Sequence, residues 1–121
     1  MRKQPPHSFK LFGNTWHVTF KDPMKVKRLH TKAEKKFFDT HPDHRVWGLA
    51  VASRTTGRRD IYIHPEHRSN WQTFGHEVLH ALHLEMEIHR KEKGWAKWSR
   101  KLHRDLDQFA GPFGQFLKEN L

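Results

Sequence analysis

Alternation of apolar and polar residues near the start of the chain predicts a β-hairpin over residues 9–20. The apolar positions that alternate with polar ones are Phe9, Leu11, Trp16, Val18 and Phe20. A period of two residues is typical of strands that bury one face. Gly13-Asn14 lies between the two runs and favours a tight turn, and Asp22-Pro23 is expected to end the second strand.

The middle of the chain predicts a short helix followed by two more strands. Thr31-Lys32-Ala33-Glu34 has the form of a capping box, in which the threonine and glutamate side chains satisfy free backbone N–H groups at a helix start. The mostly apolar run at residues 46–53 suits a strand in the middle of a sheet. A turn at residues 55–58 then leads into a strand over residues 60–64.

From residue 69 onward the apolar spacing changes to that of helices. Ser69-Asn70-Trp71-Gln72 is a second capping-box pattern and is expected to open a long helix that stops near Gly94. The apolar stripe of this helix is Trp71, Phe74, Val78, Leu82 and Met86. The inward positions of a second helix are Trp95, Trp98, Leu102, Leu106 and Phe109. Gly111-Pro112 is expected to break that helix, and a last short turn or helix follows it. Strands followed by two long helices predict an α+β fold.

Length and composition narrow the class of protein. The 121 residues predict one domain, 1–121, with the hairpin at 8–20 and a core over 46–120. The chain has no cysteine, so His, Asp and Glu are the available metal ligands. No apolar run follows the charged N-terminus, and the longest apolar run, 46–52, is too short to span a bilayer. We expect a cytoplasmic protein, or one in the host-cell interior if it is phage-encoded, with no membrane partner.

The charge of the chain allows a polyanionic partner. The formal net charge is +10 and the pI is about 10.2, which attracts nucleic acid or acidic protein at a distance. No aromatic-basic RNA-binding motif accompanies the charge. A well-solvated basic surface without a specific partner explains the same composition equally well, so nucleic acid stays open as a partner and oligomeric state is not predicted.

The segment His76-Glu77-Val78-Leu79-His80 carries the chemistry. Two histidines four residues apart lie on one face of a helix, with Cβ atoms about 6 Å apart, so both rings can ligate one Zn²⁺ at about 2.0–2.1 Å. Glu77 lies beside them and can take a proton from water that the metal acidifies. Gly75 is costly inside a helix, and a metal site or substrate close to the backbone would justify it.

These residues carry a family resemblance. The runs Val46-Trp47-Gly48-Leu49-Ala50-Val51, Ile61-Tyr62-Ile63 and Thr73 to Leu82 resemble the small HExxH zincins, above all the phage-type metallopeptidases and their minigluzincin and SprT-like relatives. The resemblance implies a compact zincin-like domain, with a small twisted β-sheet packed on an active-site helix and a C-terminal backing helix. It also implies that an edge strand pairs with the extended substrate. That strand is expected at Asp60, Ile61, Tyr62 and Ile63.

A catalytic zinc needs a third protein ligand. His83 lies a full helical turn beyond His80, which is too far on an unbroken helix. If the two long helices form a hairpin about Gly94, the level of His80 falls near residue 108 of the second helix. The candidates there are, in order, Asp105, His103 and Asp107. Some of the resembling families use a Glu from the second helix as the third ligand. This chain has no Glu between Glu92 and Glu119 that could take that role.

The expected function is therefore zinc-dependent hydrolysis of a peptide or protein substrate, with one Zn²⁺ per chain. His76 and His80 are the expected ligands and Glu77 is the general base, while Tyr62 or His64 is a candidate helper for the oxyanion. The alternative is a weak or inactive zincin-fold module that binds nucleic acid or an acidic protein through its basic surface. A small basic nuclease fits less well, because the usual Asn/Asp-rich pattern of such sites is absent.

Overall fold

The protein is described here by a computed structural model. The residues that it describes are 4–26, 35–36, 39–40, 46–53, 56–90 and 100–121, without the side chains of 86–90 and 100–107. The capping box at 31–34 and the helix stop at Gly94 lie outside these residues.

Four strands form one mixed sheet. They are β1 (Ser8–Leu11), β2 (Asn14–Phe20), β3 (Gly48–Ala52) and β4 (Arg59–Ile63). Their order is β1-β2-β4-β3. The pairs β1–β2 and β3–β4 are antiparallel, whereas β2 and β4 are parallel, with His17 beside Asp60. The hairpin and both later strands are therefore confirmed, and so is the α+β class.

Two details of the strands differ from expectation. The hairpin turn is at Phe12 and Gly13, both with positive φ (50° and 79°), so Asn14 already belongs to β2. The prediction that residues 46–53 lie in the middle of the sheet is wrong, because β3 is an edge strand and β4 is internal. Burial agrees with the second difference. Ile61 and Ile63 of β4 are fully buried, as expected for a strand that has a neighbouring strand on each side.

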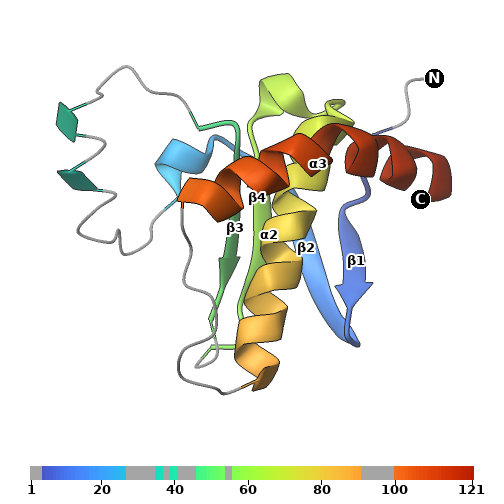
Figure 1. The fold of residues 1–121 in the computed structure, drawn as a ribbon, viewed down its shortest axis with the longest axis horizontal. Helices are drawn as coiled ribbons and strands as arrows, with labels where there is room; N and C mark the ends of the chain where they lie inside the picture. Colours follow the sequence, from blue (N-terminus) through green and yellow to red (C-terminus); the bar gives the residue numbers. More distant parts are fainter. Residues whose placement is uncertain (1–3, 27–34, 37–38, 41–45, 54–55, 91–99) are drawn as a thin grey trace.

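Two long helices cover one face of the sheet in successive layers. The helices are α2 (Trp71–Arg90) and α3 (Arg100–Asn120), and short 3₁₀ helices lie at Pro23–Lys25 and Pro65–His67. Figure 1 shows α2 lying along the sheet and α3 crossing α2 on its outer side, over the half of α2 nearer its N-terminus. Within the described residues, no helix combines the length and apolarity required to cross a bilayer.

The hydrophobic core lies between α2 and the sheet. Its fully or nearly fully buried members are Trp16, Val18, Ile61, Ile63, Trp71, Phe74, Val78 and Ala81. The α2 positions among them recur at three- and four-residue spacing, as expected for one helix face. Leu82, predicted to lie in this stripe, is half-buried, and Ala81 occupies the core position instead.

Glycines allow α3 to approach α2 at backbone distance. A Cβ on Gly75 would lie 2.8 Å from the backbone nitrogen of Gly114 and 3.1 Å from the carbonyl oxygen of Ala110. A Cβ on Gly114 would collide with the carbonyl oxygen of Trp71. The expectation that Gly75 accommodates a metal or substrate is therefore wrong, because the backbone that approaches it belongs to α3.

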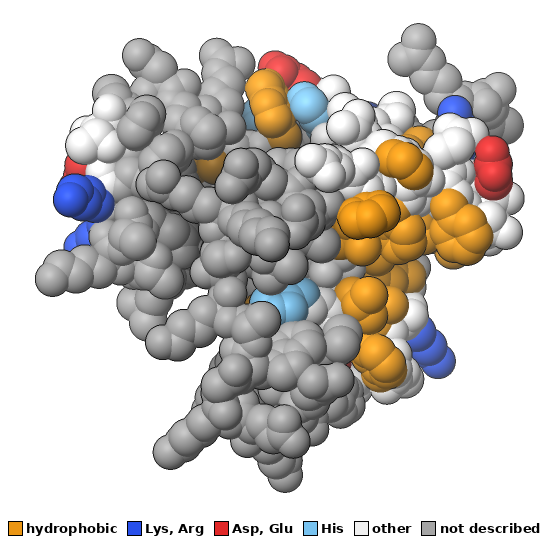
Figure 2. Space-filling view, in the orientation of Figure 1, with side chains coloured by type: hydrophobic (Ala, Val, Ile, Leu, Met, Phe, Trp, Pro, Cys, Tyr) orange, Lys and Arg blue, Asp and Glu red, His pale blue; other side chains and the backbone are white. Residues whose placement is uncertain are grey.

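Helix α3 continues through Gly111-Pro112, so the predicted break there is wrong. Pro112 is inside α3 and removes one backbone hydrogen bond, at a cost of about 3 kcal/mol. Burial of residues before and after Pro112 offsets this cost. Ala110 is 1% exposed, and Phe113 and Leu117 pack against the core. Phe109, expected to face inward, is 65% exposed. Figure 2 shows the hydrophobic side chains gathered over the C-terminal half of α3.

A fully buried carboxylate joins α2 to the sheet. Glu85, which is 0% exposed, accepts hydrogen bonds from Nε1 of Trp16 at 2.9 Å and from Nδ2 of Asn14 at 3.3 Å. It also forms an ion pair with Arg59 of β4. Burial raises the pKa of Glu85, but the Arg59 guanidinium and the Trp16 and Asn14 donors lower it by more, so that the pKa lies below its ordinary value.

The glycine contact predicts opposite effects for two substitutions in α3. Gly114→Ala should lower the free energy of unfolding by about 2 kcal/mol, because the added methyl group forces α2 and α3 apart. Gly111→Ala is the matched control, since its Cβ would meet nothing within 4 Å, and alanine favours a helix. Urea denaturation of the two variants measures the difference, and equal losses would contradict this account of the crossing.

The buried carboxylate predicts a pH-dependent loss of stability. Glu85→Gln should lower the free energy of unfolding at pH 7 by about 3 kcal/mol, because the guanidinium of Arg59 loses its charged partner. The pKa of Glu85 is depressed in the folded protein, so its contribution is complete above the unfolded pKa of about 4.3 and is lost as the pH falls through the folded value. Denaturation curves of the variant and the wild type should converge on acidification. The exposed Glu119→Gln is the control.

Candidate metal centre

The start of α2 fixes the position of the candidate ligands along the helix. The side-chain oxygen of Asn70 accepts hydrogen bonds from the backbone N–H groups of Gln72 (3.0 Å) and Thr73 (3.2 Å), which is N-capping. The capping residue is thus Asn70 and not Ser69, one position later than the capping-box pattern indicates. His76, Glu77 and His80 follow in the second and third turns of the helix.

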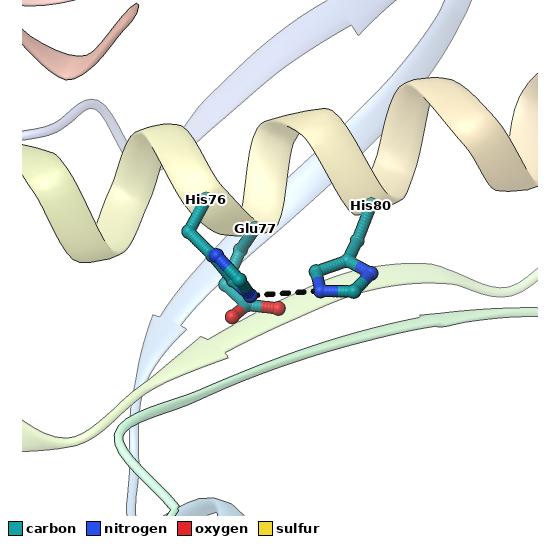
Figure 3. Close-up of side chains that lie close together, drawn as sticks. All are labelled: His76, Glu77 and His80. Carbon is teal, nitrogen blue, oxygen red and sulfur yellow. Dashed lines mark hydrogen bonds between the residues drawn. The ribbon is translucent and has the colours of Figure 1, made fainter. Parts of the chain in front are cut away.

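Three side chains of α2 converge on one point. Ligand atoms of His76, Glu77 and His80 all lie within 4.8 Å of one another. The Nε2 atoms of the two histidines are 2.8 Å apart, and their ring centroids are separated by 4.6 Å. Figure 3 shows the three side chains projecting from the same side of α2, where β3 and β4 run. Within the part of the chain that the structure describes, no other group of His, Asp or Glu residues meets this criterion.

Glu77 is held between the helix and the edge strand. Its side chain is 5% exposed, and a Cβ on Gly48 of β3 would lie 2.6 Å from its Oε2 atom and 2.7 Å from its Cγ atom. Only glycine at position 48 therefore leaves room for the carboxylate. Sequence reasoning named Gly48 within the family resemblance but gave it no role, because the contact joins positions 29 residues apart in the sequence.

The donor set fits a transition-metal ion of the zinc type. Imidazole nitrogens are borderline ligands that suit Zn²⁺ and its neighbours more than Mg²⁺ or Ca²⁺, whereas the carboxylate is a hard ligand that all of these ions accept. A tetrahedral zinc with nitrogens at about 2.0–2.1 Å holds them about 3.4 Å apart. The 2.8 Å separation of the two Nε2 atoms reaches that value through small rotations of the histidine side chains. Glu77 is close enough either to bind the ion or to act on a water beside it.

The three candidates for a third ligand lie in α3. Asp105, His103 and Asp107 belong to the N-terminal half of that helix, and their side chains lie outside the described residues. In Figure 1 this half of α3 extends past α2 on the side where β3 runs. His83, which is half-buried on α2, does not join the group, in agreement with its greater distance along the helix.

The structure does not bring Tyr62 to the histidine pair. Ile61 and Ile63 face α2 in the core, so the alternation of a strand places Tyr62 on the opposite face of the sheet. There its hydroxyl accepts a hydrogen bond from Nη2 of Arg58 at 2.7 Å. The arrangement argues against Tyr62 as an oxyanion helper.

His64 has a structural role at the start of a 3₁₀ helix. Its Nδ1 accepts a hydrogen bond from the backbone N–H of Glu66 at 3.1 Å, and its Nε2 lies 4.0 Å from a carboxylate oxygen of Asp22. The ring packs edge-on against Trp47, which also stacks on His67 at 4.2 Å. His64 is thus not part of the group formed by His76, Glu77 and His80.

The prediction that residues 60–63 form the edge strand that pairs with substrate is wrong. The residues Asp60, Ile61, Tyr62 and Ile63 belong to β4, which pairs with β2 on one side and β3 on the other. The strand at the edge beside the candidate metal centre is β3. Sequence reasoning placed the two strands in the opposite order, because the more continuous apolar run of β3 is typical of an internal strand.

Comparison with known proteins gave no relative from which a role could be transferred. No protein-family model matches the chain, no curated protein matches it, and no solved structure matches it. The case for function therefore rests on the geometry of His76, Glu77 and His80.

Proposed function

We propose that this protein is a zinc-dependent metallopeptidase in which His76 and His80 hold the metal and Glu77 is the general base. The observation that carries the proposal is the convergence of the three side chains, whose ligand atoms lie within 4.8 Å of one another. Two imidazoles with an adjacent buried carboxylate form a donor set suited to hydrolysis at a metal ion.

Each residue then has a defined task. When bound, zinc supplies Lewis acidity that polarises a peptide carbonyl and acidifies water. Glu77 accepts a proton from the attacking water and returns it to the leaving amine, so the carboxylate ends the cycle as it began. Its contact with Gly48 keeps the carboxylate beside the histidine pair, and the low exposure of Glu77 excludes competing solvent from it.

The open edge of β3 offers an extended peptide a place to bind. The carbonyl oxygen of Trp47 accepts a hydrogen bond from the N–H of His64, and the N–H of Ser53 donates one to the carbonyl oxygen of Arg58. The odd-numbered residues of this strand therefore form its hydrogen bonds to β4. The alternation of an antiparallel ladder then directs the peptide groups of Gly48, Ala50 and Ala52 away from β4. None of the described strands pairs with that edge, and a substrate can add to it as a further strand.

Helical register revises the ranking of the third ligand. Ala110 and Gly114 are the α3 residues nearest Gly75, and positions 103 and 107 precede Ala110 by seven and three residues. At about 100° per residue both positions share the face of Ala110, whereas position 105 lies about 140° away from it. We therefore favour His103 or Asp107 over Asp105 as the ligand that completes the site.

The first test is metal content. Protein dialysed against zinc should retain one zinc per chain by elemental analysis, and His76→Ala/His80→Ala should reduce this to background because two of three ligands are lost. His17→Ala removes an exposed histidine of β2 and should leave the content unchanged. Single alanine variants at His103, Asp105 and Asp107 then identify the third ligand. Equal zinc in the double variant and the wild type would disprove the centre.

The second test is cleavage of an unstructured protein such as denatured casein. Glu77→Gln should reduce the rate at least 100-fold while zinc is retained, because the amide cannot accept the proton. Gly48→Ala should also reduce it, since the new methyl group displaces the carboxylate without changing its chemistry. His17→Ala is again the control. Cleavage that survives Glu77→Gln would reject the proposed base, and a zinc-loaded wild type without cleavage would reject the peptidase.

A further inference from the structure

A cavity lies along β3 and the turn that follows it, with one wall from α2. It has a volume of about 500 Å³, which is within the usual range for ligand sites. The residues that line it are Ala50, Val51, Ala52, Ser53, Thr56, Arg58 and Leu84.

The two elements that carry the metal centre and its contact with Gly48, α2 and β3, also line the cavity. On α2, Leu84 follows His80 by four residues, which is one helical turn or about 5–6 Å along the axis. On β3, Ala50 follows Gly48 by two residues, or about 7 Å, and Gly48 contacts the carboxylate of Glu77. A peptide that lies along β3 with its reacting bond at Glu77 therefore passes the cavity within two or three residues.

Small side chains on β3 create the space. Ala50 and Ala52 face α2 and are only half-buried, although both contact the hydrophobic core. Their outward peptide groups pair with an added strand, whose side chains alternate between the two faces of the sheet. A side chain of such a strand on the α2 face would lie beside Ala50, Ala52 and Leu84, which line the cavity.

The lining selects an apolar side chain. Alanine and leucine line it on the α2 face, and among the described lining residues Arg58 alone is charged. Its guanidinium lies with Tyr62 on the face of the sheet opposite α2. Its Nε donates to Oδ2 of Asp60 at 2.8 Å and its Nη2 donates to the hydroxyl of Tyr62 at 2.7 Å. The guanidinium is thus already paired with a carboxylate, so an acidic substrate side chain gains little by binding there.

We propose that this cavity is a specificity pocket that takes a large apolar side chain, such as Leu, Met or Phe, from a peptide bound along β3. The inference rests on the proposed peptidase function and adds the substrate class to it. Ala52 lines the pocket from β3 and Leu84 lines it from α2.

The test uses a digest of mixed peptides by the zinc-loaded 121-residue chain. Sequenced cut sites should show enrichment of Leu, Met or Phe at one fixed position near the cleaved bond. Peptide pairs that differ only as Leu or Ala at that position should then differ in kcat/KM by roughly tenfold or more. Ala52→Leu should shift the preference towards Ala and Val, and Leu84→Ala should weaken it. Leu117→Ala truncates another half-buried leucine that packs on the same core and should change neither.

A second measurement separates failure of the pocket from failure of the peptidase. Zinc-loaded Glu77→Gln binds peptides without cleaving them, so affinities for the same Leu and Ala pairs report the pocket alone. Cleavage with no apolar preference, or with a preference that both pocket variants leave intact, overturns the pocket and leaves the peptidase standing. A Leu preference in binding that Ala52→Leu abolishes, without any cleavage by the wild type, supports the pocket and rejects the peptidase.

Discussion

The structure depends on two close contacts of α2, one with the backbone of β3 and one with the backbone of α3. On one side, Gly48 of β3 leaves room for the carboxylate of Glu77; on the other, Gly75 and Gly114 let α3 contact the helix at backbone distance. The buried ion pair of Glu85 with Arg59 holds the same helix further along. These contacts hold α2, and with it the histidine pair, in a defined position relative to the edge strand.

Local patterns predicted much of this arrangement. The hairpin, the two later strands and the long helix follow from apolar periodicity, and the spacing of His76 and His80 alone places both rings on one helix face. The convergence of Glu77 with the two histidines is consistent with the metal centre that the motif predicts, while the zinc itself and the hydrolysis remain proposals.

Contacts between distant positions account for what the sequence did not reveal. The order of the strands depends on β4 pairing with β2 across 43 residues, from His17 to Asp60, and no local pattern encodes that choice. The burial of Glu85 depends on Trp16 and Arg59 from the sheet, so no local pattern in α2 reveals it. Pro112 reads as a helix breaker, yet packing of Phe113 and Leu117 outweighs its local cost.

The parallel pairing of β2 with β4 also bears on the order in which the molecule assembles. The hairpins β1–β2 and β3–β4 close short loops and can form within microseconds, whereas joining them closes a far longer loop and is expected to limit the folding rate. The two imidazoles need only their own helix to come together, but the carboxylate reaches its place only after β3 has docked. The arrangement of the histidine pair is thus set by one helix alone, whereas the position of the carboxylate depends on the completed sheet.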